Sequence, residues 1–232
     1  VGIGAYVGWQ LHDKRGRFCL KDSLAVHNTP EGSSVGIVKN LSYMAHVTIQ
    51  SNSMSIYDYV IPHITTVETL TPIELFNKTK VFVNGCWIGI TENPSHLFTM
   101  LKTMKCKGII NIYTSIVFDY KVNEIRVCND GGRVTRPLLR IKDKNILLSS
   151  QIINDLKNKF LTWDDLFTDC KIGEAVLEYI DPEEQNHSMI ATKPRDLLET
   201  LASDNMYMST HCEIHPSTMF GVIASCIPFP EH

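Results

Sequence analysis

The chain has 232 residues, of which 44% are hydrophobic and 9% aromatic. This composition can bury the core of one large or two small domains, and it excludes a disordered chain. The 22 basic and 25 acidic residues leave a net charge of −3, unlike the strongly basic balance of a freestanding nucleic-acid-binding protein.

The seven cysteines are scattered, and no two have the C-x-x-C spacing of a zinc ribbon or redox motif. We therefore expect reduced cysteines in an intracellular protein. No signal peptide is recognisable, and the uncharged stretch 216–230 is too short to span a bilayer, so no membrane partner is expected. Because the first residue is Val1 rather than Met, we expect a piece of a longer protein or a processed product.

Short β elements are predicted for the first 28 residues, separated by polar turns. The strand-like runs are 5–11, 17–20 and 24–26. A turn-rich loop follows at 29–34, and the later part of 35–51 is expected to be a strand. Residues 52–78 show no strong periodicity, which predicts a connection with one short helix at 72–76.

A small α+β unit is predicted for residues 80–142. Asn84-Gly85 lies between two apolar runs, which is the strongest short signal for a β-hairpin. A helix should follow, because Asn93 can cap it, Pro94 suits its first turn and Gly108 suits the position just past its end. Its apolar face is formed by Leu97, Met100, Leu101 and Met104. Further strands are expected at 109–120, 124–128 and 138–141.

The last part of the chain is predicted to mix helices with one strand. Residues 150–170 are expected to be helical with a break near Thr162, and 175–180 to form a strand. The acidic segment 181–184 could bind a cation, but a surface turn is the commoner outcome, and 194–202 is expected to be a short helix. The whole chain is therefore assigned to the α+β class, with several domains.

Two motifs could bind ions, but their spacing argues against this. His211 and His215 stand at i and i+4, as metal ligands on a helix would, but Pro216 disfavours a helix there. The zincin pattern also requires a Glu directly after its first His, so a buried polar turn is the favoured interpretation. The segment 130–133, with Arg136, lacks the spacing of a phosphate-binding loop, and we interpret it as a glycine turn between strands.

The segment His27-Asn28-Thr29 could carry peptide-bond chemistry. An Asn side-chain amide can attack its own main-chain carbonyl and break the following bond, and a preceding His can polarise that carbonyl or donate a proton. A hydroxyl after the cut can accept an incoming ester. The triplet is common by itself, but here it lies where the chain changes character.

Several blocks after residue 28 resemble, in order, the second-largest subunit of multisubunit DNA-directed RNA polymerases. They include T-P-E-G at 29–32, V-G-I-V-K-N-L at 35–41, V-F-V-N-G-C-W-I-G at 81–89, D-G-G-R-V at 130–134, E-Y-I-D at 178–181, T-H-C-E-I-H-P-S at 210–217 and I-P-F-P-E-H at 227–232. They cover about residues 29–232 and look most similar to eukaryotic-nuclear or large-DNA-virus subunits. The family continues past His232 into an Asn-Gln-Ser-Pro-Arg segment.

Residues 1–28 resemble the carboxyl end of an intein. The similar blocks are Y-V-G-W-Q-L at 6–11, G-R-F-C-L at 16–20 and V-H-N at 26–28. By this resemblance His27 assists, Asn28 cyclises and Thr29 is the first extein residue and nucleophile. The intein's amino-terminal nucleophile is absent, so this chain alone should not splice. The alternative hypothesis is that splicing is the main activity and the polymerase sequence its extein.

The two resemblances together imply five segments. They are 1–28, the intein end; 29–78, the end of the fork region and a connection; 79–142 and 143–210, two small external domains; and 211–232, the start of the hybrid-binding region. DNA-templated RNA synthesis would belong to the assembled enzyme. The resemblance implies no cofactor in this fragment and Mg²⁺ in the assembled polymerase, whose metal-binding aspartates lie mainly in the largest subunit and in later sequence.

The resemblance also implies partners and a location. Partners would be the largest and other polymerase subunits, the DNA template and the RNA–DNA hybrid. The residues expected near nucleic acid are Glu31, Lys39, Asn40, Glu231 and His232, whereas few phosphate contacts are expected from 80–205. The location would be the nucleus, or the virion or cytoplasmic factory of a virus.

Overall fold

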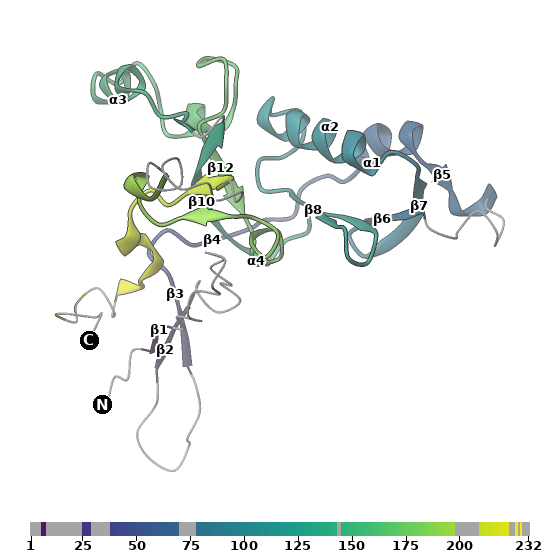
Figure 1. The fold of residues 1–232 in the computed structure, drawn as a ribbon, viewed down its shortest axis with the longest axis horizontal. Helices are drawn as coiled ribbons and strands as arrows, with labels where there is room; N and C mark the ends of the chain where they lie inside the picture. Colours follow the sequence, from purple (N-terminus) through teal and green to yellow (C-terminus); the bar gives the residue numbers. More distant parts are fainter. Residues whose placement is uncertain are drawn as a thin grey trace, which may run out of the picture. The chain divides into compact units, whose positions relative to one another are not determined.

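The computed structural model describes residues 6–7, 25–28, 38–69, 78–142, 145–197, 209–222, 226 and 228, with side chains from Leu41 onward except at 69 and 219. The chain divides into two compact units. Unit 1 comprises Val1–His46, Val134–Leu147 and Ile180–His232, and unit 2 comprises Val47–Arg133 and Leu148–Tyr179. Helices and strands are mixed along the chain, as the sequence predicts (Figure 1).

Unit 2 is built on a five-stranded sheet with the order β5-β7-β6-β9-β8. The strands are β5 (Thr65–Thr66), β6 (Thr79–Val83), β7 (Cys86–Thr91), β8 (Ser115–Asp119) and β9 (Glu124–Cys128). Strand β6 is antiparallel to β7 and parallel to β9, and β8 is antiparallel to β9. Helices α1 (Met54–Val60) and α2 (Pro94–Cys106) lie on one face of this sheet (Figure 1).

The core of unit 2 follows from the two-residue period of the strands. Val81 pairs with Ile125 and Val83 with Val127, so all four side chains point to the same face. Helix α1 adds Ile56 and Val60 to this core, and α2 adds its own apolar stripe. The buried residues of the unit 2 core are Ile56, Val60, Val81, Val83, Leu97, Leu101, Ile110, Ile116, Ile125 and Val127.

The hairpin and the long helix predicted from local signals are both confirmed. Asn84 and Gly85 have φ angles of 48° and 79°, as a two-residue hairpin turn requires. Helix α2 begins at Pro94, and Gly108 follows its end with φ 71°. Asn93 occupies the N-cap position, but its side chain makes no capping hydrogen bond.

Three predictions for unit 2 need correction or lie outside the description. Helix α1 lies within 52–78 and was not predicted. The helix has only seven residues and two buried positions, so it produces no recognisable periodicity in the sequence. The strand expected at 109–120 begins only at Ser115, since a turn with a hydrogen bond from Thr114 N–H to the Asn111 carbonyl precedes it. The helix expected at 72–76 falls outside the described residues.

The later part of unit 2 contains α3 (Ser150–Lys157) and the 3₁₀ helix η3 (Asp164–Phe167). The helical prediction for 150–170 is thus confirmed only in part, because residues 158–163 and 168–170 are not helical. The Ser149 hydroxyl caps α3 by accepting from the Ile152 N–H at 3.4 Å. Strand β12 (Leu177–Ile180) lies within the predicted range 175–180.

A buried ion pair joins α2 to the end of unit 2. The Lys105 ammonium lies 3.0 Å from a Glu178 carboxylate oxygen and donates to the Tyr179 carbonyl at 2.9 Å. Lys102 reaches the same Glu178 oxygen at 2.6 Å. The Lys105 and Glu178 side chains are buried, so this contact orders α2 with charges removed from water.

Unit 1 contains two groups of strands. The first has the antiparallel order β1-β2-β3, and the second the order β11-β10-β14-β13. Their bounds are β1 (Tyr6–Val7), β2 (Ala25–Asn28), β3 (Val38–Leu41), β10 (Val134–Lys142), β11 (Asn145–Ile146), β13 (Ile190–Ala191) and β14 (His211–Cys212). Leu138, Ile180 and Ile190 form a small buried cluster.

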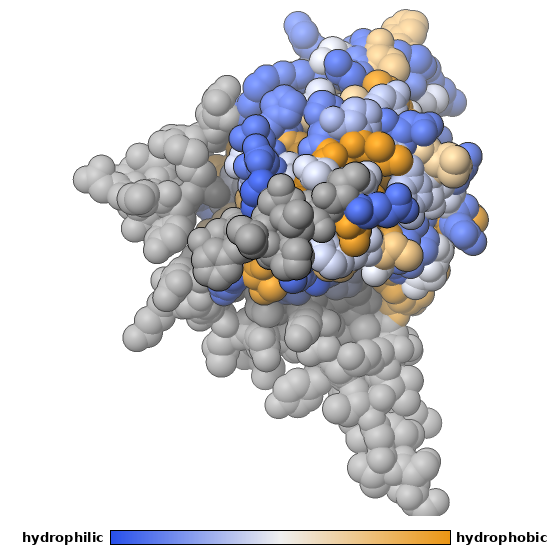
Figure 2. Space-filling model, turned by 90° about the vertical axis from the view of Figure 1, so that its right-hand side faces the viewer, coloured by the Kyte–Doolittle hydropathy of each residue, from blue (hydrophilic) through white to orange (hydrophobic). Residues whose placement is uncertain are grey.

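The remaining elements of the chain are short. They are β4 (His46–Val47), η1 (Ile61–His63), η2 (Val67–Thr69), α4 (Pro182–Gln185) and η4 (Pro216–Met219). Residues 194–197 are helical, within the predicted range 194–202, and the rest of that range lies outside the description. None of the helices in the described ranges is long and apolar enough to cross a membrane. Figure 2 shows one face on which the described surface is mostly hydrophilic, with apolar residues in smaller groups.

Candidate functional site

The hairpin motif around Asn84 and the turn motif around Asn129 meet in unit 2. Asn84 Nδ2 donates to Asn129 Oδ1 at 2.7 Å, and Asn84 Oδ1 accepts from the Asn129 N–H at 2.9 Å. Asn129 Nδ2 in turn donates to the Ser51 carbonyl at 3.2 Å, and the Ser53 hydroxyl donates to Asn129 Oδ1 at 3.1 Å. Asn129 is buried, so these bonds satisfy its amide and hold the segment before α1 against the sheet.

The glycine turn that follows Asn129 is wrapped around Thr48. The Gly132 N–H donates to the Thr48 carbonyl, and the Thr48 N–H donates to the Arg133 carbonyl, both at 2.8 Å. A Cβ on Gly131 would lie 2.9 Å from the Gln50 nitrogen, so that position requires glycine. Arg133 donates to the Tyr113 carbonyl at 3.0 Å. The interpretation of 130–133 as a structural turn is confirmed, because its polar groups bond within unit 2.

A second polar network lies in unit 1 and joins three segments that are distant in the sequence. Arg136 Nη1 donates to Glu213 Oε2 at 2.6 Å, and Arg136 Nε donates to Gln185 Oε1 at 3.3 Å. The Arg136 and Glu213 side chains are only 4% and 3% exposed. This buried pair fixes β10 to the segment after β14. The sequence analysis considered Arg136 only as a possible phosphate ligand and did not pair it with Glu213.

The expectation of an acidic surface turn at 181–184 is wrong. Asp181 and Glu184 are buried, and Asp181 Oδ1 accepts from the Glu184 N–H at 2.7 Å as the N-cap of α4. The spacing Asp-x-x-Glu was a helix-start signal that could have been found in the sequence. Burial of the carboxylates could not, because it depends on the packing of distant segments.

His211 and His215 do not share a helix face, as Pro216 predicts. His211 belongs to β14 and its Nδ1 lies 2.9 Å from the Thr210 hydroxyl. His215 precedes η4 and accepts from the Ser217 N–H at 3.2 Å. The part of the chain that the structure describes has no group of three His, Cys, Asp or Glu side chains suited to holding a metal ion.

The cysteine of strand β14 is buried and poorly reactive. The Cys212 side chain is fully buried, and burial followed by the nearby Glu213 charge raises the pKa of its thiol to about 11. Cys212 is therefore a packing residue rather than a nucleophile at neutral pH.

One hydrogen bond brings together the two segments expected near nucleic acid. The Tyr43 N–H, two residues after β3, donates to the Phe220 carbonyl just past η4 at 2.8 Å. In unit 1 the K-N-L motif that ends β3 thus lies near the segment that follows T-H-C-E-I-H-P-S.

The described strands place four of the predicted site residues. His27 and Asn28 lie in β2, Lys39 and Asn40 lie in β3, and His27 is the register partner of Lys39. These strands pair across the junction expected after Asn28, so β2 is part of the same sheet as β3. The other predicted site residues lie outside the described ranges: Thr29, Glu31, Glu231 and His232.

Three family models match the chain in sequence order. The model described as "RNA polymerase Rpb2, domain 3" matches residues 11–47, domain 4 matches 81–142 and domain 5 matches 163–216. This succession identifies the chain as part of a multisubunit RNA polymerase subunit. It belongs to the Rpb2 family, the second-largest subunit, as a segment covering domains 3 to 5.

Curated relatives agree with these matches. The RPB2 subunit of DNA-directed RNA polymerase II from Encephalitozoon cuniculi is 38% identical over 88% of the chain. RNA polymerase II subunit 2 of Arabidopsis thaliana is 33% identical over 96% of the chain, and RNA polymerase subunit 2 of Acanthamoeba polyphaga mimivirus is 33% identical over 90%. The chain spans only 18–19% of the length of these relatives.

The comparisons give no support to an intein at the start of the chain. The domain 3 match begins at residue 11 and continues through residue 47, across the expected junction between Asn28 and Thr29. Residues 11–28 thus match polymerase sequence, although their short apolar runs and the V-H-N triplet also resemble an intein end.

Proposed function

We propose that this chain serves as part of the second-largest subunit of a DNA-directed RNA polymerase, which synthesises RNA on a DNA template in the assembled enzyme. The single observation that carries the proposal is the ordered match of three successive domains of one subunit family. Nucleotidyl transfer in the assembled enzyme would require Mg²⁺.

The proposed partners are the largest and other polymerase subunits, the DNA template and the RNA–DNA hybrid. The segments with β3 and with β14 to η4 are the proposed neighbours of nucleic acid, and their contact through Tyr43 and Phe220 supports treating them as one surface. The proposed external domains are 79–142 and 143–210. Relatives from nuclear genomes and from a giant virus favour the nucleus or a viral factory as the location.

Purification of the full-length parent subunit from its own cell or virus tests the proposal. The largest polymerase subunit should co-purify, and the complex should extend RNA on a DNA template only when Mg²⁺ is present. A parent protein that purifies without a largest subunit, or a complex without templated synthesis, would contradict it.

A photo-crosslinking residue at position 39 tests the proposed nucleic-acid surface in that assembled enzyme. Crosslinks to template or hybrid are expected from position 39 and not from the matched control position 157, at the exposed end of α3. Equal crosslinking from both positions would remove Lys39 from the proposed surface.

Splicing at the bond between Asn28 and Thr29 remains the alternative hypothesis, and two observations count against it. The domain 3 match crosses the bond, and β2 pairs with β3 across it. Mass spectrometry of the mature parent subunit decides the matter. A peptide that contains both Asn28 and Thr29 is expected, whereas a peptide in which a residue other than Asn28 is joined to Thr29 would revive the intein hypothesis.

A further inference from the structure

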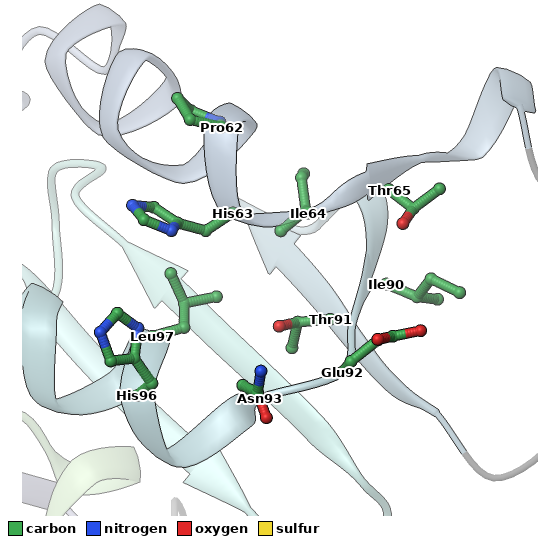
Figure 3. A pocket seen from close by; sticks show the side chains of 10 residues that line it. All are labelled: Pro62, His63, Ile64, Thr65, Ile90, Thr91, Glu92, Asn93, His96 and Leu97. Carbon is green, nitrogen blue, oxygen red and sulfur yellow. The ribbon is translucent and has the colours of Figure 1, made fainter.

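The surface hollow at the start of α2 in unit 2 contains no buried group in need of a ligand. It has a volume of about 310 Å³ and is lined by η1, β5, the end of β7 and the first turn of α2, with the His63 and His96 rings at one end (Figure 3). None of the described side chains that line it has a buried polar atom without a hydrogen-bond partner. The polar network around Arg136 in unit 1 differs in this respect.

That network contains two buried donors that lack an acceptor. The Arg136 guanidinium donates from Nη1 to Glu213 and from Nε to Gln185 Oε1. Its third nitrogen, Nη2, and the Gln185 amide nitrogen, Nε2, have no hydrogen-bond partner within the described chain. Arg136 and Gln185 are only 4% and 1% exposed, so bulk solvent cannot supply the missing acceptor. Buried donors without an acceptor are unfavourable and therefore point to a bound acceptor.

A different orientation of the Gln185 amide would not satisfy these donors. The guanidinium has donors only, so the amide must turn its oxygen toward Arg136 Nε and its nitrogen away. The guanidinium is also planar, and an N–H of Nη2 points alongside the N–H of Nε. The missing acceptor for Arg136 is therefore required beside the Gln185 side chain, where Nε2 also lacks one.

The charges around the two donors favour a neutral ligand over an anion. Arg136 is already paired with Glu213, and Asp181 and Glu184 of the adjoining α4 segment add further buried carboxylates. A chloride ion would therefore meet an excess of negative charge in a place with little water to screen it. A water molecule carries no net charge, and its oxygen can accept from both donors.

We propose that Arg136 Nη2 and Gln185 Nε2 bind one buried water molecule, called here the β10–α4 water. Its oxygen accepts from both nitrogens, and its own protons are left for carbonyl or carboxylate oxygens of unit 1. Buried waters in proteins typically satisfy polar groups of this kind through two to four hydrogen bonds. The β10–α4 water thus joins β10 to α4, as the ion pair with Glu213 joins β10 to the segment after β14.

NMR of the isotope-labelled 232-residue chain tests the proposal through magnetisation transfer from water to the Gln185 side-chain amide. A water held inside unit 1 tumbles with the chain, so the transfer should have opposite signs in the laboratory and rotating frames, whereas proton exchange gives the same sign in both. Gln151 on the exposed surface of α3 is the matched control and should show exchange only. Identical behaviour of the two amides would overturn the proposal.

Gln185→Glu tests the geometry, because it replaces the amide nitrogen by an oxygen that can accept directly from Arg136 Nη2. The water signal at the Arg136 guanidinium should disappear in this variant and persist in the control variant Gln151→Glu; its persistence in Gln185→Glu would contradict the assigned position. A crystal structure of the unchanged chain grown with bromide gives a measurement that needs no variant. Density for a water is expected about 2.9 Å from both nitrogens. No density there, or an anomalous bromide peak, would refute the β10–α4 water.

Discussion

The buried pair between Arg136 and Glu213 makes the strongest stability prediction. Glu213→Gln preserves the side-chain shape but leaves the Arg136 guanidinium buried without a countercharge. The pair is 2.6 Å long and its side chains are 4% and 3% exposed, so solvent can replace little of the lost interaction. Breaking such a pair on one side costs roughly 3–5 kcal/mol, which is a large part of the stability of an ordinary domain.

Alkylation of the neighbouring Cys212 thiol measures this loss directly. The thiol is fully buried, so it reacts only when β14 opens, and each 1.4 kcal/mol changes the opening equilibrium about tenfold. The Glu213→Gln variant should therefore react roughly two to four orders of magnitude faster than the unchanged chain. Mass spectrometry can follow Cys212 separately from the exposed Cys86.

Two controls define the result. Glu92→Gln removes an equally short pair whose carboxylate is exposed, and it should leave Cys212 alkylation unchanged. The double variant Arg136→Met, Glu213→Leu should recover most of the protection, because no lone charge remains buried. If Glu213→Gln accelerated alkylation less than about fivefold, the pair would not be a desolvated contact and the reasoning would fail.

Three further predictions concern unit 2. Gly89→Ala would place a Cβ 2.2 Å from a backbone oxygen of β5, so β5 should separate from β7 and its amides should exchange faster with solvent. Glu178→Gln leaves the buried Lys105 ammonium without its carboxylate and should lower the free energy of unfolding in urea by about 3 kcal/mol. Hydrogen bonding from Lys171 lowers the pKa of Asp165 to about 2, so this carboxylate stabilises the fold above its ordinary pKa of 3.8, an effect lost as pH falls toward 2. A carboxyl NMR titration should show that midpoint, and Lys171→Met should raise it.

The elements that could be predicted are those specified by neighbouring residues. The turn at Asn84-Gly85 needs only two residues with positive φ, and α2 carries its start, its apolar stripe and its terminal glycine within one short segment. Helix α1 was missed because its fold depends on Ile56 and Val60 reaching a sheet formed by later residues. The parallel pairing of β13 with β14 is equally non-local, and no period in either segment indicates it.

In the candidate site too, local motifs could be predicted from the sequence, whereas burial by distant segments could not. The motifs were visible in the sequence, but the carboxylates of Asp181 and Glu184 were assigned to the surface because acidic residues usually lie there. Nothing in the segment itself reveals that it packs inside unit 1. The V-H-N triplet was similarly ambiguous, since three residues in a short strand are compatible with an intein end and with the polymerase domain that the match across residues 11–47 indicates.

The motif residues that reveal the family are mostly contacts between distant segments. Asn84 and Asn129 are 45 positions apart, and Arg136 and Glu213 are 77 apart. Each pair holds its unit together, and the buried Arg136–Glu213 pair cannot itself touch a nucleic acid. Residues that contact a nucleic acid must present hydrogen-bond donors at the surface. The crosslinking experiment therefore addresses β3 rather than these buried networks. A crosslink from position 39 would support β3 as part of the nucleic-acid surface. Rapid Cys212 alkylation in Glu213→Gln would show that the buried Arg136–Glu213 pair stabilises unit 1 instead.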